Sequence, residues 1–79
     1  MQSKFETIAR LAGLPNPEKL AGQRIGFLTT AGDVSGNVLS AEKGCVVLNH
    51  VKHNGVELNA DKYVLFADAI IGYWVDKLK

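Results

Sequence analysis

The stretch QRIGFLTTAGDVSGNVL, residues 23–39, decides the fold of this 79-residue chain. It predicts two strands, at about 23–30 and 34–40, joined by a turn that contains Gly32. Gly36 lies inside the returning strand, where glycine weakens the sheet unless a sharp bend or a close backbone approach is needed. Small barrels need such bends to close. The hairpin therefore predicts a bent β-barrel rather than a flat sheet.

An amphipathic helix is expected ahead of this hairpin, over residues 3–12. Ser3 and Glu6 have the spacing of a capping box, in which each side chain satisfies a backbone donor at the helix start. Apolar residues recur at i, i+3, i+4 and i+7, so one side of the helix should pack on an apolar surface. Residues 13–22 are expected to connect the helix to the barrel, with one short helical turn beginning at Pro17.

Further short strands are expected to complete the barrel. Asn54 and Gly55 form the strongest short-range hairpin signal in the sequence. The expected strands are 45–52, a return strand that begins at Val56, is interrupted near 59–61 and resumes over 62–66, and a last strand at 70–75. A tight connection with one 3₁₀ turn is expected over 67–69. The chain is thus predicted to be one domain, with the barrel at 23–75 and a polar tail at 76–79.

The charge pattern excludes several classes of partner. The net charge is +1, and the nine basic and eight acidic residues are scattered, so the chain has no strong electrostatic footprint for nucleic acid or for a membrane surface. Cys45 is the single cysteine, which excludes an intrachain disulfide. The charged N-terminus does not fit a signal peptide, and no apolar run approaches the ~20 residues of a membrane span. We expect a soluble, cytoplasmic protein.

The later strands favour an assembly of several copies. Segments 46–48, 63–66 and 70–75 are apolar without alternation, so apolar side chains point to both faces of the sheet. We expect a homo-oligomer in which the last two strands meet neighbouring copies edge to edge, since open edges are otherwise an aggregation hazard. The alternative is a monomer in which the helix and the curvature bury enough surface. The residues expected at the subunit interface are Tyr63, Leu65, Ile71, Tyr73 and Trp74. The last two are adjacent in one strand, so one faces the core and the other does not.

The order of these elements resembles the Sm-like (LSm/Hfq) family of SH3-type small β-barrels. The likeness is carried by residues 25–32 with 36–39, by 45–51, and by 64–71, where a strand passes through a tight turn into the last strand. The resemblance implies an N-terminal helix followed by a five-stranded, strongly bent antiparallel barrel. It also implies ring assembly through the fourth and fifth strands, and RNA as a ligand.

The RNA-contacting residues of that family do not carry over to this chain. Where many members have an Asp and later an Asn entering the third strand, this chain has SAEKGC at 40–45. Where they have Arg-Gly before the last strand, it has Phe66 and Ala67. Both loops therefore lack the amide and the guanidinium that read or stack on bases. The resemblance places the ligand loops at Lys43, Gly44, Cys45, Phe66, Ala67 and Asp68.

No catalytic or metal-binding motif stands out. Cys45, His50 and His53 are the only soft metal ligands, and the first two face opposite sides of one strand, so we expect no metal and no cofactor. Gly32 and Gly36 are explained by the turn and the bend, because no phosphate-loop pattern accompanies them. Without paired acids or a triad we expect no enzyme. The leading hypothesis is an oligomeric Sm-like binding module that binds single-stranded RNA at an altered site. The alternative is a structural or protein-interaction barrel without RNA binding, such as an accessory protein of a virus or mobile element.

Overall fold

The computed structural model describes residues 4–42 and 44–75, and it confirms a mainly β chain with an N-terminal helix. Strands make up 52% of the described residues. No helix in the described ranges is long and apolar enough to cross a membrane. Ser3, Lys43 and the expected tail at 76–79 lie outside the described residues. The elements in chain order are α1 (Lys4–Leu11), the 3₁₀ turn η1 (Pro17–Leu20), β1 (Arg24–Thr29), β2 (Gly32–Ala41), β3 (Cys45–His53), β4 (Val56–Glu57), β5 (Tyr63–Phe66), the 3₁₀ turn η2 (Ala67–Ala69) and β6 (Ile70–Val75).

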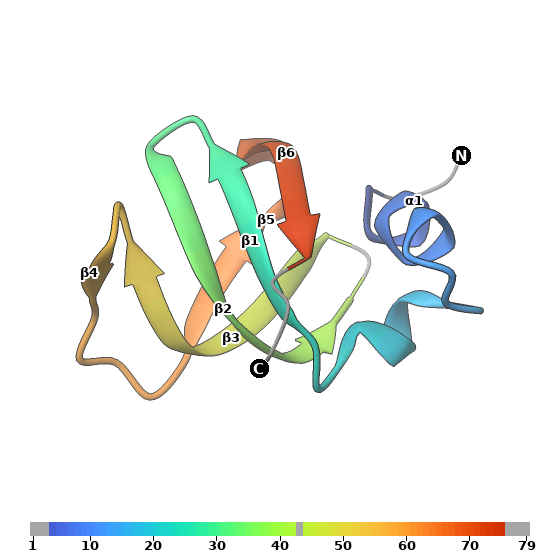
Figure 1. The fold of residues 1–79 in the computed structure, drawn as a ribbon, viewed down its shortest axis with the longest axis horizontal. Coiled ribbons are helices and arrows are strands. Elements are labelled where there is room, and N and C mark those ends of the chain that lie inside the picture. The colour runs from blue at the N-terminus through green and yellow to red at the C-terminus, as the bar shows by residue number, and fades with distance from the viewer. Residues whose placement is uncertain (1–3, 43, 76–79) are drawn as a thin grey trace.

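The strands form one antiparallel sheet that is strongly curved but not closed (Figure 1). The order is β4-β3-β2-β1-β6, and β5 pairs with the first half of β3, whose other end pairs with β4. The expected return strand is therefore divided into β4 and β5, which gives six strands instead of five. Within the described residues the expected closure of the barrel is not found, because there β5 pairs only with β3 and β6 only with β1.

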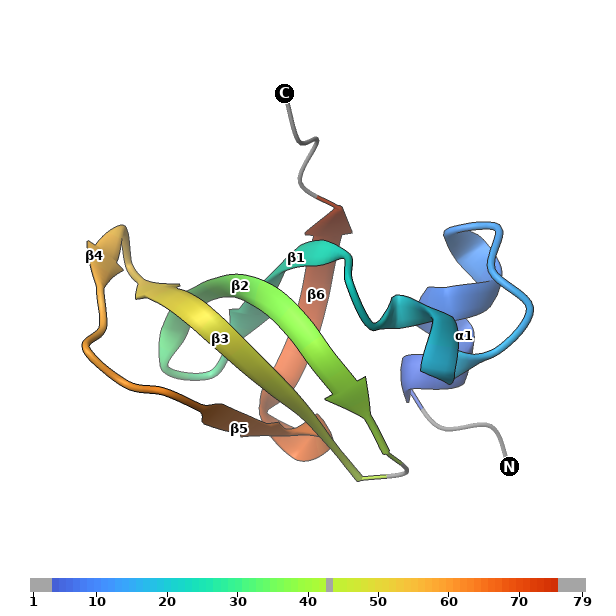
Figure 2. The same ribbon diagram turned by 90° about the horizontal axis from the view of Figure 1, so that it is seen from below.

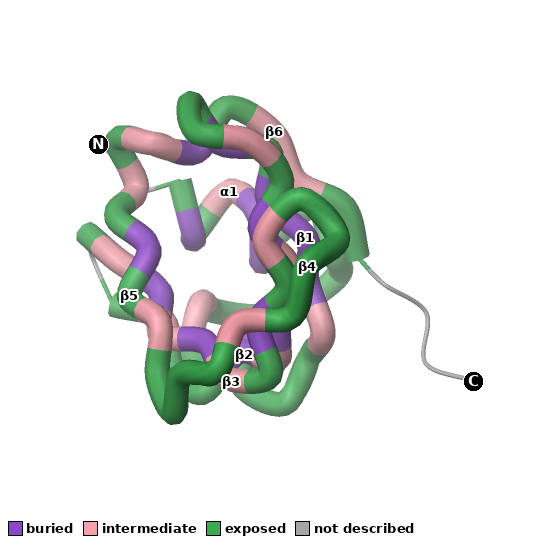
Figure 3. Tube along the Cα trace, turned by 90° about the vertical axis from the view of Figure 1, so that its left-hand side faces the viewer, coloured by how far each residue is buried: buried purple, intermediate pink, exposed green. Residues whose placement is uncertain are grey.

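The helix covers one end of the curved sheet. Figures 1 and 2 both show α1 and η1 at the end opposite the β3–β4 hairpin. The helix ends in a Schellman-type arrangement, in which the N–H of Leu14 donates to the carbonyl of Ala9 at 2.8 Å and Gly13 has φ of 81°. Every element but β4 and η2 contributes to one apolar core, and buried segments recur along the chain (Figure 3). The buried apolar side chains are Phe5, Ile8, Ala9, Leu20, Ile25, Phe27, Val34, Val38, Val46, Leu48, Val51, Leu65 and Ile70.

Two tight turns lie against each other at the far end of the sheet. The β1–β2 turn occupies Thr30 and Ala31, one residue earlier than expected, and Gly32 already belongs to β2 with φ of 114°. Asn54 and Gly55, with φ of 53° and 84°, form the two-residue β3–β4 turn. Positive φ at both central residues is the type I′ geometry that Asn-Gly favours. The Oδ1 of Asn54 accepts a hydrogen bond of 2.8 Å from the N–H of Asp33, which ties the two turns together.

The bend in the sheet is located where β2 crosses β3. The pairing skips one residue between Ser35 and Asn37, opposite His50, whose φ of 49° marks an extra residue in β3. A Cβ at Gly36 would lie 2.9 Å from the carbonyl oxygen of Asn49. The two backbones approach so closely here that only glycine fits without a shift.

Candidate functional site

The most distinctive surface consists of two open strand edges on either side of the turn η2 (Ala67–Ala69). We refer to this turn as the corner. β5 enters the turn η2 and β6 leaves it, yet the two strands pair with different neighbours, β3 and β1. Each strand therefore has one edge without a partner strand in the described part of the chain. Unpaired strand edges can pair with another chain. We refer to these as the β5 edge (Tyr63–Phe66) and the β6 edge (Ile70–Val75).

The β5 edge alternates between core and surface. Leu65, one of the residues predicted at the subunit interface, is only 5% exposed, and its side chain belongs to the core. The reason is the period of two in a strand, which sends its neighbours Val64 and Phe66 outward. These two are 48% and 65% exposed, and the sequence prediction did not include them in the interface. Tyr63 is partly buried and packs against the core.

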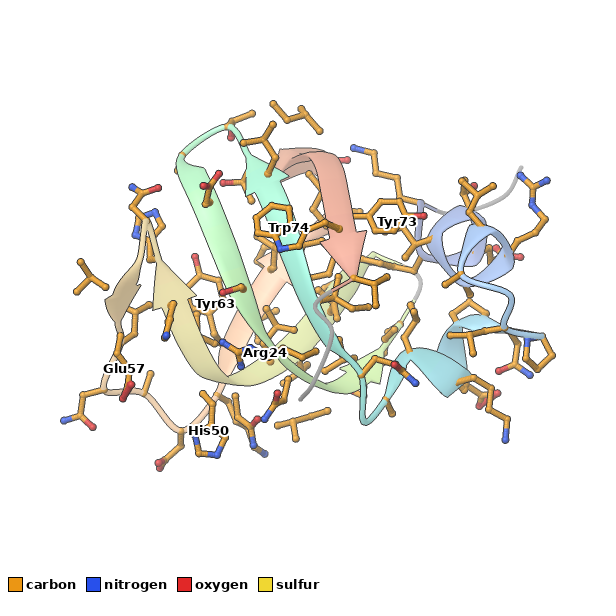
Figure 4. All side chains as sticks on the ribbon, in the orientation of Figure 1. Arg24, His50, Glu57, Tyr63, Tyr73 and Trp74 are labelled. Carbon is orange, nitrogen blue, oxygen red and sulfur yellow. The ribbon has the colours of Figure 1, made fainter. Side chains whose placement is uncertain are left out.

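The two adjacent aromatic residues of β6 lie on opposite faces of the sheet, because side chains alternate along a strand. Tyr73 pairs with Phe27 and packs against the core, on the side of the sheet that faces α1 (Figure 4). Trp74 pairs with Gly26 and lies on the other face, where its indole covers the space that a side chain at position 26 would need. Ile71 is 67% exposed, so it is the most prominent apolar side chain of this edge.

An apolar groove of about 270 Å³ runs between α1 and β6. Sequence patterns could not reveal it, because it forms only where α1 meets the last strand. Its lining residues are Lys4, Thr7, Ile8, Ile70, Ile71, Gly72 and Tyr73.

The helix start is tied directly to the corner between the two edges. The Nζ of Lys4 donates to the carbonyl oxygens of Ala67 at 2.7 Å and Ile70 at 2.8 Å. These acceptors lie at the beginning of η2 and just after its end. The N–H of Thr30 donates to the carbonyl of Ala69 at 3.0 Å. The corner is thus anchored from two directions, which fixes the angle between β5 and β6.

The structure brings the two expected ligand loops together. Cys45 is the cross-strand partner of Phe66, and the N–H of Ala67 donates to the carbonyl of Gly44 at 2.9 Å. Asp68 is exposed in η2, beside this contact. Lys43 lies outside the described residues. Among the described residues of these loops the only large side chain is Phe66, and none carries a guanidinium or a carboxamide.

The candidate metal ligands lie at different points along β3. Cys45 is a partly buried free thiol at the start of β3, and His53 binds the carbonyl of Ala31 through Nε2 at 3.0 Å at the other end. Within residues 4–42 and 44–75 no group of three or more histidine, cysteine or acidic residues could hold a metal ion. A pocket with several polar lining residues lies beside His50, between β3 and the segment that joins β4 to β5.

Comparisons with protein-family models, with curated proteins and with solved structures each found no match.

Proposed function

We propose that the chain is the subunit of a homo-oligomeric, non-enzymatic binding module of the Sm-like type, in which the β5 edge of one copy pairs with the β6 edge of the next. The observation that carries the proposal is the pair of open antiparallel edges flanking η2, with Phe66 on one side and Ile71 on the other, each about two-thirds exposed. Pairing the edges would satisfy their backbone groups and cover part of the apolar surface that these side chains expose. Because the two edges differ, the contact is heterologous and closes into a ring when the rotation permits.

Single-stranded RNA is the proposed ligand of this assembly. Phe66 is exposed directly beside Gly44 and offers an aromatic face on which a base could stack. In a ring, the loops of successive copies would bring several such faces together. The site would differ from that of the family, since stacking takes the place of amide and guanidinium contacts.

A second candidate is a structural or protein-interaction barrel. It is favoured by the absence of base-reading groups among the described residues of the loops, where Gly44, Cys45, Ala67 and Asp68 provide little beyond backbone atoms and one carboxylate. Carboxylates repel phosphate, so this composition suits a polypeptide partner better than a nucleic acid.

Light scattering coupled to size-exclusion chromatography tests the assembly. We expect a mass that is a multiple of 8.5 kDa at micromolar concentration. Phe66→Asp and Ile71→Asp should each reduce it to the monomer, because each places a carboxylate in the pairing edge. Leu11→Asp is the matched control: Leu11 is 65% exposed but lies at the end of α1 and belongs to neither edge strand. A monomeric wild-type chain would overturn the proposal.

Mixing the two edge variants tests the heterologous geometry. Phe66→Asp retains an intact β6 edge and Ile71→Asp an intact β5 edge, so the mixture should form a dimer although neither variant self-associates. If either variant alone remains dimeric, the pairing joins like edges and the ring is ruled out.

Uridine-rich and adenosine-rich oligonucleotides at two salt concentrations distinguish the two functions. RNA binding should weaken as salt rises, because phosphate contacts release counterions. An assembled protein that binds neither oligonucleotide would establish the interaction barrel in place of the RNA module.

A further inference from the structure

The apolar groove between α1 and β6 lies beside the open β6 edge. Ile71 and Tyr73 belong to that edge and also line the groove. The helix lines it with Thr7 and Ile8. The volume of about 270 Å³ exceeds the roughly 150 Å³ of a cavity that accepts a benzene ring. We refer to this hollow as the α1–β6 groove, and it has room for an apolar side chain that approaches from the β6 edge.

The strand directions decide how a second copy can reach this groove. The sheet runs β5-β3-β2-β1-β6 through four antiparallel pairings, so its first and last strands point the same way. A second copy in the same orientation would therefore pair its β5 with β6 in parallel. Antiparallel pairing is more stable per residue, and the pairings within the described part of the chain all use it. It requires the second copy to be turned over about the axis that runs across the strands, which exchanges the two faces of its sheet.

This exchange of faces brings the outward side chains of β5 to the side of α1. Val64 and Phe66 are 48% and 65% exposed and point away from the core of their own copy. Once the second copy is turned over, they lie on the face of β6 that carries Tyr73 and faces α1 (Figure 4). Parallel pairing would place them on the opposite face, beside Trp74.

One register satisfies both the faces and the strand lengths. Directly opposed residues of an antiparallel pair share a face. Val64 must therefore lie opposite one of the α1-side residues of β6, which are Ile71, Tyr73 and Val75. Only the position opposite Tyr73 keeps all four residues of β5 against residues of β6. The other two positions carry β5 past one end of its partner.

The same register matches the side chains along the contact. It places Phe66 opposite Ile71 on the α1 side and Tyr63 opposite Trp74 on the other face, and such aromatic cross-strand pairs stabilise a sheet. The four residues of β5 are only about 14 Å long, so backbone pairing alone falls short of the ~1,000 Å² that a specific interface buries. A contact that also covers the α1–β6 groove adds the apolar area that is exposed there.

We propose that β5 of one copy pairs antiparallel with β6 of the next in this register, with the side chain of Val64 in the α1–β6 groove. Val64 then packs against Tyr73 and against Ile8 of the helix. Phe66 lies at the end of the paired segment, next to the corner, so its ring is covered on one side only. The inference rests on the proposed function, because it needs the two edges to pair. It adds the orientation of the second copy, the register, and the helix as part of the interface.

Nuclear Overhauser contacts between copies of the unaltered protein provide the direct test. One population of chains carries protonated valine methyl groups and the other protonated tyrosine and tryptophan rings, each in an otherwise deuterated background, and the two are mixed by refolding from urea. We expect contacts from the Val64 methyl groups to the ring of Tyr73. Contacts from Val64 to the indole of Trp74 would indicate parallel pairing and overturn the inference. An assembly without the contact between Val64 and Tyr73 would overturn it as well.

A variant of the helix tests the groove without changing either edge. Thr7→Phe fills the groove from α1, so it should raise the concentration at which half of the chains are assembled by roughly tenfold, the effect of one overpacked side chain. Leu11→Phe is the matched control, since Leu11 is exposed on the same helix and does not line the groove. Val64→Ala should weaken assembly alone but recover part of the loss when added to Thr7→Phe, because it makes room for the new ring.

Light scattering separates this inference from the proposed function. A wild-type chain that is monomeric at micromolar concentration overturns both. An assembled protein in which Thr7→Phe and Leu11→Phe behave alike overturns the groove contact alone and leaves the paired edges in place. Independent, additive effects of Thr7→Phe and Val64→Ala would have the same meaning. If Thr7→Phe lowers the Tm of the isolated chain, the contacts measured in the unaltered protein decide the question.

Discussion

The indole of Trp74 covers Gly26, its cross-strand partner in β1. A Cβ at position 26 would overlap the ring atoms Cε2 and Cζ2, so the close contact requires that Gly26 have no side chain. The indole thereby packs over the backbone of β1 while remaining 40% exposed. Aromatic residues packed over strand glycines stabilise such sheets by shielding a backbone that would otherwise face water.

Gly26→Ala should destabilise the fold by about 1–3 kcal/mol, the usual cost of overpacking. The indole is held by its strand, so it must rotate away and lose its contact with β1. In the background of Trp74→Ala the same substitution should cost much less, because the obstacle is gone. Urea unfolding of both single variants and the double variant measures this coupling. Gly44→Ala is the control, since nothing lies within 4 Å of a Cβ there; equal losses at the two glycines would contradict the contact.

Gly36→Ala should also destabilise the fold, by about 1–3 kcal/mol, for a different reason. The new methyl would meet the carbonyl oxygen of Asn49 at 2.9 Å and Val51 Cγ2 at 3.1 Å, and a backbone atom of a paired strand cannot easily move. Gly72→Ala is the comparison: its methyl would find Leu28 Cβ at 3.6 Å, an ordinary contact. We expect this second change to be neutral or stabilising by up to about 1 kcal/mol, because it restricts the unfolded chain. Equal midpoints in urea would show that β2 and β3 are not in close contact at the bend.

Local signals in the sequence predicted most of the elements. Proline at position 17, the pair Asn54–Gly55 and the interruption near 59–61 each act within a few residues, so their effect can be predicted without the fold. The non-closure of the sheet was not predictable in this way. It depends on β5 and β6 choosing β3 and β1 as partners, which is a tertiary choice.

The candidate site was less predictable than the fold. Continuous apolar runs in the last strands predicted apolar side chains on both faces of the sheet, but they did not fix which side chains of each strand face the core. Leu65, which was predicted at the subunit interface, has a buried side chain, and the exposed Phe66 was predicted as a ligand-loop residue and not as part of the interface. The pocket beside His50 gave no signal at all, because its lining comes from β3 and from the segment between β4 and β5, which only the fold brings together.

Asn54 should contribute more to the stability of the fold than the free energy of its side-chain hydrogen bond alone. Asn54→Gly retains the backbone's tolerance of φ 53° but loses the bond to the N–H of Asp33, which should cost about 1 kcal/mol. Asn54→Ala loses the bond and also places a Cβ-bearing residue without a local partner in the left-handed region, which should add about 1 kcal/mol more. Thermal unfolding of the two variants separates these contributions. Asn16→Ala is the control, because Asn16 is extended, with φ of −161°, and makes no side-chain cap hydrogen bond. If Asn54→Gly were as destabilising as Asn54→Ala, backbone strain would not be part of the role of Asn54.

Lys4→Met should loosen the corner between the two edges without unfolding the core. The variant retains the apolar stem of the lysine but removes the donor to the carbonyls of Ala67 and Ile70, which should lower local stability by about 1–2 kcal/mol. Hydrogen exchange at the amides of 67–71 should accelerate by roughly tenfold, while amides in the paired centre of β2 remain protected. Lys19→Met, in the exposed part of η1, is the matched control and should leave these rates unchanged. If exchange accelerates equally throughout the sheet, Lys4 supports the whole domain and not the corner. If the proposed assembly forms, the variant should also raise the concentration needed for it, because the angle between β5 and β6 would no longer be fixed before the copies meet.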